Sequence, residues 1–268
     1  MVAVAQLVQS ARLWSERSPV RTWSVTQNAA IAQLGERHLG RMEVTSSILV
    51  SGSKIRVMEL KIEKLAKGMR IITGEQAKNR RKVLNQMIEL AEGEGFDEIT
   101  LPCVEPSEVY TDKAGPEILG QMYVFPDKKG RELCLRPEGT ATIQLIANKT
   151  WKGRKDVKVW YFERCWRYER PQAGRYREFF QFGVEWLEPR DPEKARKELL
   201  ELAKRMCELV SSEYEYDTNV KRGLEYYVED GFEISFPSLG AQKQVVGGGT
   251  YKEGVGFAVG FDRLMLVE

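Results

Sequence analysis

Hydrophobic and polar positions alternate with a period of two in the segment REFFQFGVEWLE, residues 177–188. In an extended strand this period places one set of side chains on each face: Phe180, Phe182, Val184 and Trp186 on the first, and Phe179, Gln181, Gly183 and Glu185 on the second. The first face is entirely apolar, so we expect it to contact the core. The second carries two polar side chains beside a glycine. It either lines a polar pocket with space for a ligand or forms the solvated outer face of an antiparallel sheet.

Three segments are predicted to be helices. Residues 75–96 have the helical period, with glycines to end them, and the apolar positions near one face are Ala77, Leu84, Met87, Ile88 and Ala91. Residues 191–210 repeat this pattern behind Asp191 as N-cap and Pro192 at the first helical position. A shorter helix is expected to begin at Thr140, with the threonine as its cap.

Strand patterns occupy most of the remaining chain between residues 98 and 260. EITLPCVEP predicts a short strand that ends at a proline-bounded turn, and residues 122–140 predict a hairpin with its turn at 127–130. Further strands are expected within residues 157–168, 177–188, 223–236 and 254–260. Because hairpins replace regular βαβ alternation, we predict an α+β fold with a mainly antiparallel sheet flanked by helices.

Composition limits the classes of site and partner. Lys+Arg 41 against Asp+Glu 39 gives a net charge of only +2, so a nucleic-acid partner requires a local basic surface. The four cysteines form no CxxC pair and suit thiols in a reducing compartment. No apolar run approaches the roughly 18–20 residues of a membrane span, so we expect a cytoplasmic protein. The single histidine, His38, excludes histidine-based triads and metal sites from the rest of the chain.

Residues 1–57 do not follow the pattern of a folded domain. They are rich in Ser, Arg, Gln and Val, poor in acids, and show no sustained period. An organellar transit peptide is one interpretation. The other is a spurious extension that resembles the translation of a transfer-RNA gene, with the true start at Met58. We therefore expect a leader over 1–57 and a folded domain over 58–268.

Arginines gather at one predicted turn. Arg167, Arg170, Arg175 and Arg177 lie in or beside the connection between two strands. A guanidinium donates paired hydrogen bonds and stays charged, so it suits phosphate, although a solvated charged hairpin is the alternative. Arg222 stands beside two tyrosines, and Arg263 begins a helix after a glycine-rich strand.

Five segments, in this order, resemble the motifs of the histidyl-tRNA synthetases, which are class II aminoacyl-tRNA synthetases. They are LPCVEP with Pro102, LRPEGT at 135–140, RYERPQAGRYREFFQFGVEW at 167–186, RGLEYY at 222–227, and GVGFAVGFDRL at 254–264. The resemblance covers roughly residues 67–268 and implies the class II catalytic core. It also implies homodimerisation through the Pro102 region.

The resemblance implies a role for each matching residue. For ATP they are Arg167 at the α-phosphate, Arg175 and Arg263 at the distal phosphates, and Glu169. For histidine they are Glu138 and Gln181 at the α-amino group, Glu185 and Tyr227 at the imidazole, Tyr226, and Arg222 at the carboxylate. Arg222 and Arg167 are the implied catalytic residues. Magnesium would bridge the phosphates without a protein metal site, and tRNA(His) would accept the histidyl group.

The sequence also departs from the family pattern. Only 35 residues separate Trp186 from Arg222, where the family usually inserts a small helical domain; the chain stops at FDRLMLVE; and Thr250 replaces an expected arginine. A separate chain would then supply anticodon recognition. A noncatalytic histidine-binding paralogue, similar to the regulatory subunit of ATP phosphoribosyltransferase, and a truncated inactive fragment remain alternatives. The complete set of ATP arginines favours the enzyme.

Overall fold

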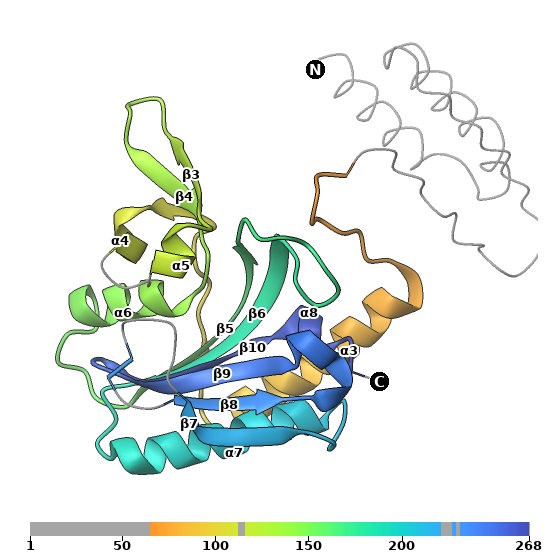
Figure 1. The fold of residues 1–268 in the computed structure, drawn as a ribbon. Helices are drawn as coiled ribbons and strands as arrows, with labels where there is room; N and C mark the ends of the chain where they lie inside the picture. The colour runs from red at the N-terminus through yellow and green to blue at the C-terminus, as the bar shows by residue number, and fades with distance from the viewer. Residues whose placement is uncertain (1–64, 112–115, 221–226, 229–230, 268) are drawn as a thin grey trace, which may run out of the picture. The chain divides into compact units, whose positions relative to one another are not determined.

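The computed structural model describes residues 65–111, 116–220, 227–228 and 231–267 (Figure 1). The expected leader and two of the predicted site residues, Arg222 and Tyr226, lie outside these ranges. Among the helices within them, none is both long and apolar enough to cross a bilayer.

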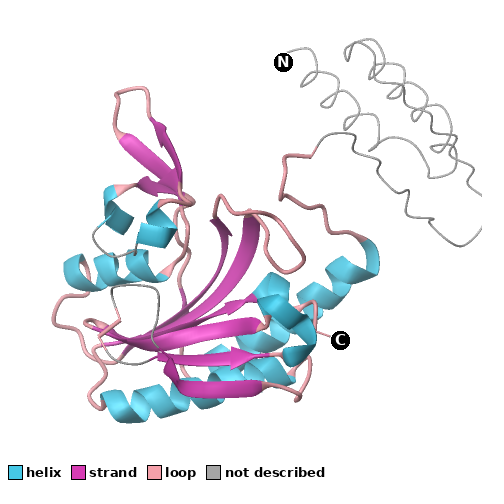
Figure 2. Ribbon diagram, viewed as in Figure 1, coloured by secondary structure: helices cyan, strands magenta, loops and turns pink. Residues whose placement is uncertain are grey.

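The described part of the chain contains two sheets (Figure 2). The larger has the strand order β1-β5-β6-β10-β9-β8-β7, and the smaller has the order β2-β4-β3. Every named strand pair is antiparallel except β1 with β5, which confirms the predicted α+β class. The larger sheet contains β1 (Asp97–Glu98), β5 (Val157–Trp166), β6 (Glu178–Leu187), β7 (Glu215–Val220), β8 (Gly231–Ser235), β9 (Gln244–Tyr251) and β10 (Gly254–Gly260). The smaller contains β2 (Val104–Pro106), β3 (Tyr123–Pro126) and β4 (Glu132–Leu135).

Helices cover both faces of the larger sheet. On one face α3 (Gly74–Gly93) and α7 (Pro192–Glu208) pack on Trp160, Phe182 and Val184. On the other face α6 (Thr140–Lys149) packs on Val159 and Tyr161. The shorter helices are α4 (Glu108–Thr111), α5 (Pro116–Leu119), the 3-10 helix η1 (Pro237–Gln242) and α8 (Phe261–Leu264).

Strand β6 has the two faces that its alternation predicts. Phe182 and Val184 are buried in the core on the α7 side. Gly183 and Glu185, on the opposite face, are buried as well, so a solvated outer face is wrong for this strand. A Cβ at Gly183 would lie 2.0 Å from the Tyr161 ring, and glycine therefore allows the tyrosine to cross the strand.

The predicted helix at 191–210 is confirmed, and the cap of α6 is not. Asp191 Oδ1 accepts a hydrogen bond of 3.0 Å from Lys194 N at the start of α7. At α6, Thr140 makes no cap. Gly139 occupies the N-cap position, and the carboxylate of Glu138 accepts from the backbone N–H groups of Thr140 (2.7 Å) and Ala141 (2.8 Å). A carboxylate there satisfies donors that the helix itself leaves unpaired.

The hairpin at 122–140 is confirmed, whereas EITLPCVEP forms two strands in different sheets. The Asp127 side chain accepts from Lys129 N and Arg131 N in the turn between β3 and β4, and Gly130 has a φ of 79°. The chain leaves the larger sheet after β1 and enters the smaller one at β2. The helix at 75–96 is confirmed as α3, although its buried face includes Arg80.

Candidate active site

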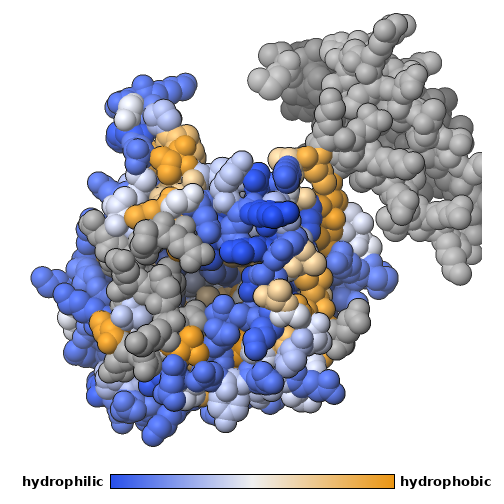
Figure 3. Space-filling view, viewed as in Figure 1, coloured by the Kyte–Doolittle hydropathy of each residue, from blue (hydrophilic) through white to orange (hydrophobic). Residues whose placement is uncertain are grey.

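A cavity of about 420 Å³ opens beside β6, β9 and β10 (Figure 3). It is bounded by the turn between β5 and β6, the start of α6 and the start of α8. The predicted site residues that line it are Glu138, Arg167, Glu169, Arg175, Gln181, Tyr227 and Arg263. Segments that lie far apart in the sequence thus meet around one space.

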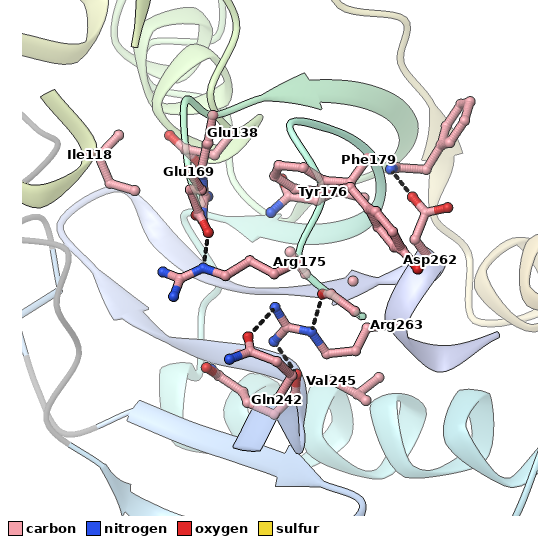
Figure 4. A pocket seen from close by; sticks show the side chains of 18 of the residues that line it. Ile118, Glu138, Glu169, Arg175, Tyr176, Phe179, Gln242, Val245, Asp262 and Arg263 are labelled. Atoms are coloured by element: carbon pink, nitrogen blue, oxygen red, sulfur yellow. Dashed lines mark hydrogen bonds and ion pairs between the residues drawn. The ribbon is translucent and has the colours of Figure 1, made fainter. Parts of the chain in front are cut away.

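Arg263 extends across the floor of the cavity from α8 (Figure 4). Its Nε donates to the carbonyl oxygen of Gly174 at 3.0 Å, and its Nη1 donates to that of Gln244 at 2.5 Å. Its Nη2 lies 3.4 Å from Gln242 Oε1. These acceptors are neutral, so they orient the guanidinium without neutralising it, and Glu233 is the acid whose charge acts on Arg263.

Two more arginines reach the cavity from the turn between β5 and β6. Arg167 Nε donates to the Pro137 carbonyl at 3.0 Å, and its guanidinium lies 5.3 Å from the centre of the Phe179 ring. Arg175 forms an ion pair with Glu169 (Figure 4). Glu169 therefore orients Arg175 in this structure.

The three guanidinium groups influence one another. Burial lowers the pKa of Arg263, and the neighbouring charges of Arg167 and Arg175 lower it further. Because a guanidinium pKa is ordinarily so high, Arg263 still stays charged at neutral pH. Three guanidinium groups that reach one cavity offer paired donors to a multiply charged anion such as a triphosphate.

Polar side chains line the other end of the cavity. Glu138 is almost fully buried, and burial raises its pKa while the backbone donors at the start of α6 oppose that rise. Gln181 Oε1 accepts from the Cys165 thiol at 3.3 Å, which leaves its amide group for a ligand. Tyr227 also lines this region. These groups are suited to an amino acid.

Glu185 is the predicted site residue that the structure does not bring to the cavity surface. Its side chain is fully buried and accepts hydrogen bonds from Thr140 Oγ1 at 2.7 Å and Tyr251 Oη at 2.8 Å. A Cβ at Gly256 would lie 1.6 Å from Glu185 Oε2, so that glycine makes room for the carboxylate. Burial raises the pKa of Glu185 to about 8, against the opposing effect of both hydroxyl groups.

Sequence reasoning missed several residues at the site. Thr140 and Tyr251 hold Glu185, and Glu233 and Asp262 line the cavity. Thr140 could have been found within LRPEGT, next to the predicted Glu138. Tyr251 and Glu233 carry no local signal, since only the pairing of β8, β9 and β10 with β6 brings them near the site.

The residues of the described ranges contain no cluster of three His, Cys, Asp or Glu side chains suited to a metal ion. Among the acids lining the cavity, Glu169 is paired with Arg175, and Asp262 is paired with arginines outside the cavity. Glu233 also lines the cavity, where its charge acts on Arg263. A metal ion here would therefore take its ligands chiefly from a bound phosphate.

Comparison with known proteins agrees with this geometry. Residues 68–213 match the family model described as histidyl-tRNA synthetase. The chain belongs to the histidyl-tRNA synthetase family. A histidine--tRNA ligase of Archaeoglobus fulgidus is 30% identical over 310 residues, which cover 76% of this chain and 76% of that protein.

Solved structures of histidyl-tRNA synthetases share the fold. The apo S. aureus histidyl-tRNA synthetase aligns with a TM-score of 0.64 and 25% identity, over 76% of this chain and 69% of that one. A Bacillus halodurans protein described as an ATP phosphoribosyltransferase regulatory subunit/histidyl-tRNA synthetase aligns with a TM-score of 0.65 and 17% identity, over 78% and 84%. This second likeness concerns the fold alone.

The alignment with the archaeal histidyl-tRNA synthetase family member is longer than the part of this chain that it covers. Since 76% of 268 residues is about 204, many of the 310 aligned positions have no counterpart in this chain. Unmatched positions in this number agree with the short connection between Trp186 and Arg222, where the family pattern predicts an inserted domain.

Proposed function

We propose that this chain activates histidine with ATP, and that it is the ligase core which transfers the histidyl group to tRNA(His). The convergence of Arg167, Arg175 and Arg263 on one cavity carries the proposal. Glu138 and Gln181 line the same cavity, so an amino acid can lie next to the phosphates.

The proposed first step needs no protein nucleophile. A carboxylate oxygen of histidine attacks the α-phosphorus of ATP, the bond from that phosphorus to the bridging oxygen breaks, and pyrophosphate leaves with the electron pair. The protein's task is to orient two anions and to stabilise the charge of the transition state. Arg167 would contact the α-phosphate, and Arg175 and Arg263 the distal phosphates. The resemblance adds Arg222 at the carboxylate and Tyr226 at histidine.

Magnesium fits this arrangement as a partner of ATP. Mg²⁺ is commonly held by one or two carboxylates together with substrate phosphates. Glu233, on the phosphate side of the cavity, would hold the ion, and Glu169 would join it on release from Arg175. The bound ion would supply neutralisation of phosphate charge.

At the histidine end, Glu138 and Gln181 would bind the α-amino group, and Tyr227 would contact the imidazole. Glu185 would act in this conformation through Thr140 and Tyr251, whose hydroxyl groups it orients. A site that hydrogen-bonds both ring nitrogens rejects apolar analogues, because its buried polar groups would be left unpaired.

A second candidate is a noncatalytic histidine-binding regulator. The fold shared with the Bacillus halodurans protein supports it, since the description of that protein includes a regulatory subunit. The arginines disfavour it, because a sensor of histidine has no need for three guanidinium groups arranged around a second, anionic ligand. A truncated inactive fragment is the third alternative. We also propose that 58–268 is the catalytic domain, that 1–57 is a leader or a spurious extension outside it, and that the protein is cytoplasmic.

Histidine-dependent ATP–pyrophosphate exchange by the full chain tests the proposed function. We expect radiolabelled pyrophosphate to enter ATP when histidine is present, and not when any of the other standard amino acids replaces it. The exchange needs no tRNA, so it isolates the first step. Histidine binding without exchange, in a sample with native circular dichroism, would support the regulator instead.

We propose that the apolar face of the smaller sheet pairs with a second copy of the chain. Val104 lies opposite Leu135, and Phe125 lies opposite Leu133, so these residues share one face. Val104 is 45% exposed and Phe125 is 37% exposed. Apolar side chains are visible at the base of the β3–β4 hairpin (Figure 3). Val104 also belongs to LPCVEP, which resembles the dimer-interface motif of the family.

Charge on this face is expected to separate the copies. We expect Val104→Glu to raise the dimer dissociation constant by about 100-fold or more, because an unpaired carboxylate would be buried at the interface. Light scattering after size-exclusion chromatography measures the mass. Tyr216→Glu, at an exposed position of β7, is the matched control and should leave the mass unchanged. Equal masses for both variants and the unmodified chain would contradict this interface.

A further inference from the structure

Residues 65–73, here called the strap, precede α3 and lie against the arginine-bearing turn between β5 and β6. Arg177 N, in that turn, donates a hydrogen bond of 3.0 Å to the carbonyl oxygen of Gly68. Gly68 has a φ of 83°, and a Cβ there would lie 2.7 Å from Arg177 Cγ. Both the backbone conformation and the close contact therefore require glycine at this point of the strap.

Arg70 of the strap contacts two separate parts of the ATP site. Its guanidinium lies 3.3 Å from the centre of the Tyr176 ring, in the turn that also carries Arg175. It forms an ion pair with Asp262, the residue next to Arg263. Tyr176 and Asp262 line the cavity, whereas Arg70 does not. Arg70 thus joins the two arginine-bearing segments from outside the cavity.

Asp262, in α8, is buried and has partners in two other elements, so its ion pair with Arg70 helps to hold α8 in place. The residue is 3% exposed. Its Oδ2 accepts a hydrogen bond of 2.5 Å from Phe180 N in β6, and its Oδ1 lies 2.8 Å from Arg80 Nη2 in α3. The contact with Arg70 extends this anchoring to the turn between β5 and β6.

We propose that Arg70 is a positioning residue for ATP, which sets the spacing between Arg175 and Arg263 that a triphosphate requires. The inference rests on the proposed function. Arg263 itself also ties the two segments through Gly174, but its guanidinium is a proposed ligand of ATP. Arg70 can hold the segments together whether or not nucleotide is bound, because it does not line the cavity.

Loss of Arg70 should weaken ATP binding and leave histidine binding nearly unchanged. The stacking on Tyr176 and the ion pair with Asp262 both end at the phosphate side of the cavity. Glu138, at the histidine end, is fixed instead by the backbone of α6. A displaced phosphate clamp would weaken ATP binding and the alignment for attack, since displacements near 1 Å already cost reactivity.

The test compares Arg70→Ala with Arg70→Lys, Gly68→Ala and the matched control Arg81→Ala, an exposed arginine on α3. Dissociation constants for Mg·ATP are measured by calorimetry, and Michaelis constants for ATP and histidine by pyrophosphate exchange. Circular dichroism and thermal melts verify that each variant is folded.

We expect Arg70→Ala to weaken ATP binding about tenfold and to leave the Michaelis constant for histidine within about twofold. Arg70→Lys keeps the ion pair but loses the planar stacking. It should therefore recover about half of the lost ATP affinity, on a logarithmic scale. Gly68→Ala should behave like Arg70→Ala because it displaces the strap. Arg81→Ala should match the unmodified chain.

The outcomes separate this inference from the proposed function. Unchanged ATP binding in a folded Arg70→Ala variant, or an equal loss of histidine affinity, would overturn the positioning role. An Arg70-dependent ATP affinity in a chain that performs no exchange would support the positioning role and refute the enzyme. A folded chain that binds no ATP would overturn both.

Discussion

Replacing Arg263 with alanine is expected to lower kcat/KM for ATP in histidine-dependent pyrophosphate exchange by about 10³. The side chain is aimed into the cavity by acceptors at Gly174, Gln244 and Gln242, so the guanidinium is already in place before ATP arrives. Alanine removes both the positive charge and the paired donors that a distal phosphate would meet. Initial rates over a range of ATP concentrations, at saturating histidine, measure the effect.

Arg263→Lys separates charge from geometry. Lysine keeps the positive charge but cannot reproduce the planar fork, so we expect an intermediate loss of about 10- to 100-fold. The Michaelis constant for histidine should change little in either variant, because Glu138 and Gln181 lie at the other end of the cavity. Normal ATP kinetics in Arg263→Ala would remove this residue from the phosphate site.

The sequence predicts those parts of the fold in which a local pattern and the tertiary structure agree. The alternation in β6 and the cap of α7 at Asp191 depend on neighbouring residues alone, and both are confirmed. The sequence pattern does not predict strands β7 and β9. Gln244–Tyr251 has three consecutive glycines, which are unfavourable in an isolated strand. In the sheet, however, a Cβ at Gly248 would lie 2.4 Å from the Phe232 ring.

The candidate site also has residues that the sequence predicts and contacts that it does not. Arg167, Arg175 and Arg263 fall within sequence motifs, and the structure brings all three to the cavity. The contacts that orient them are not readable from the sequence. Arg70 meets Asp262 across 192 positions of the chain, and alternation gives no indication that Glu185 is covered by Tyr251. The pattern predicts which face a residue occupies, and only the tertiary packing decides whether water reaches it.

Burial of Glu185 leads to the second prediction, a stability that falls with rising pH. Burial raises the pKa of its carboxyl group from an ordinary value of 4.5 to about 8. Between these values the unfolded chain has lost the proton and the native chain retains it. The unfolded state therefore binds fewer protons, and the free energy of unfolding decreases as the pH rises through this window. Below pH 4.5 the contribution is fully present, and above about 8 it is lost.

Glu185→Gln should remove this dependence. A glutamine amide resembles the protonated acid in shape and can keep one hydrogen bond to Thr140 and one to Tyr251. Relative to the unmodified chain, the variant should gain about 1.4 kcal/mol in free energy of unfolding for each pH unit within the window. Urea denaturation at pH 5.5, 6.5 and 7.5 measures the difference, in which titrations common to both proteins cancel.

Glu89→Gln, at an exposed position of α3, is the matched control and should run parallel to the unmodified chain. Parallel curves for Glu185→Gln as well would show that the buried carboxyl group is ionised in the native state.

The protonation state of Glu185 also bears on histidine recognition. At pH 7 a protonated Glu185 is both donor and acceptor, so Thr140 and Tyr251 cannot both donate to it with the same geometry. One hydroxyl group would then be free to donate a hydrogen bond towards the cavity, where an imidazole nitrogen of histidine would accept it.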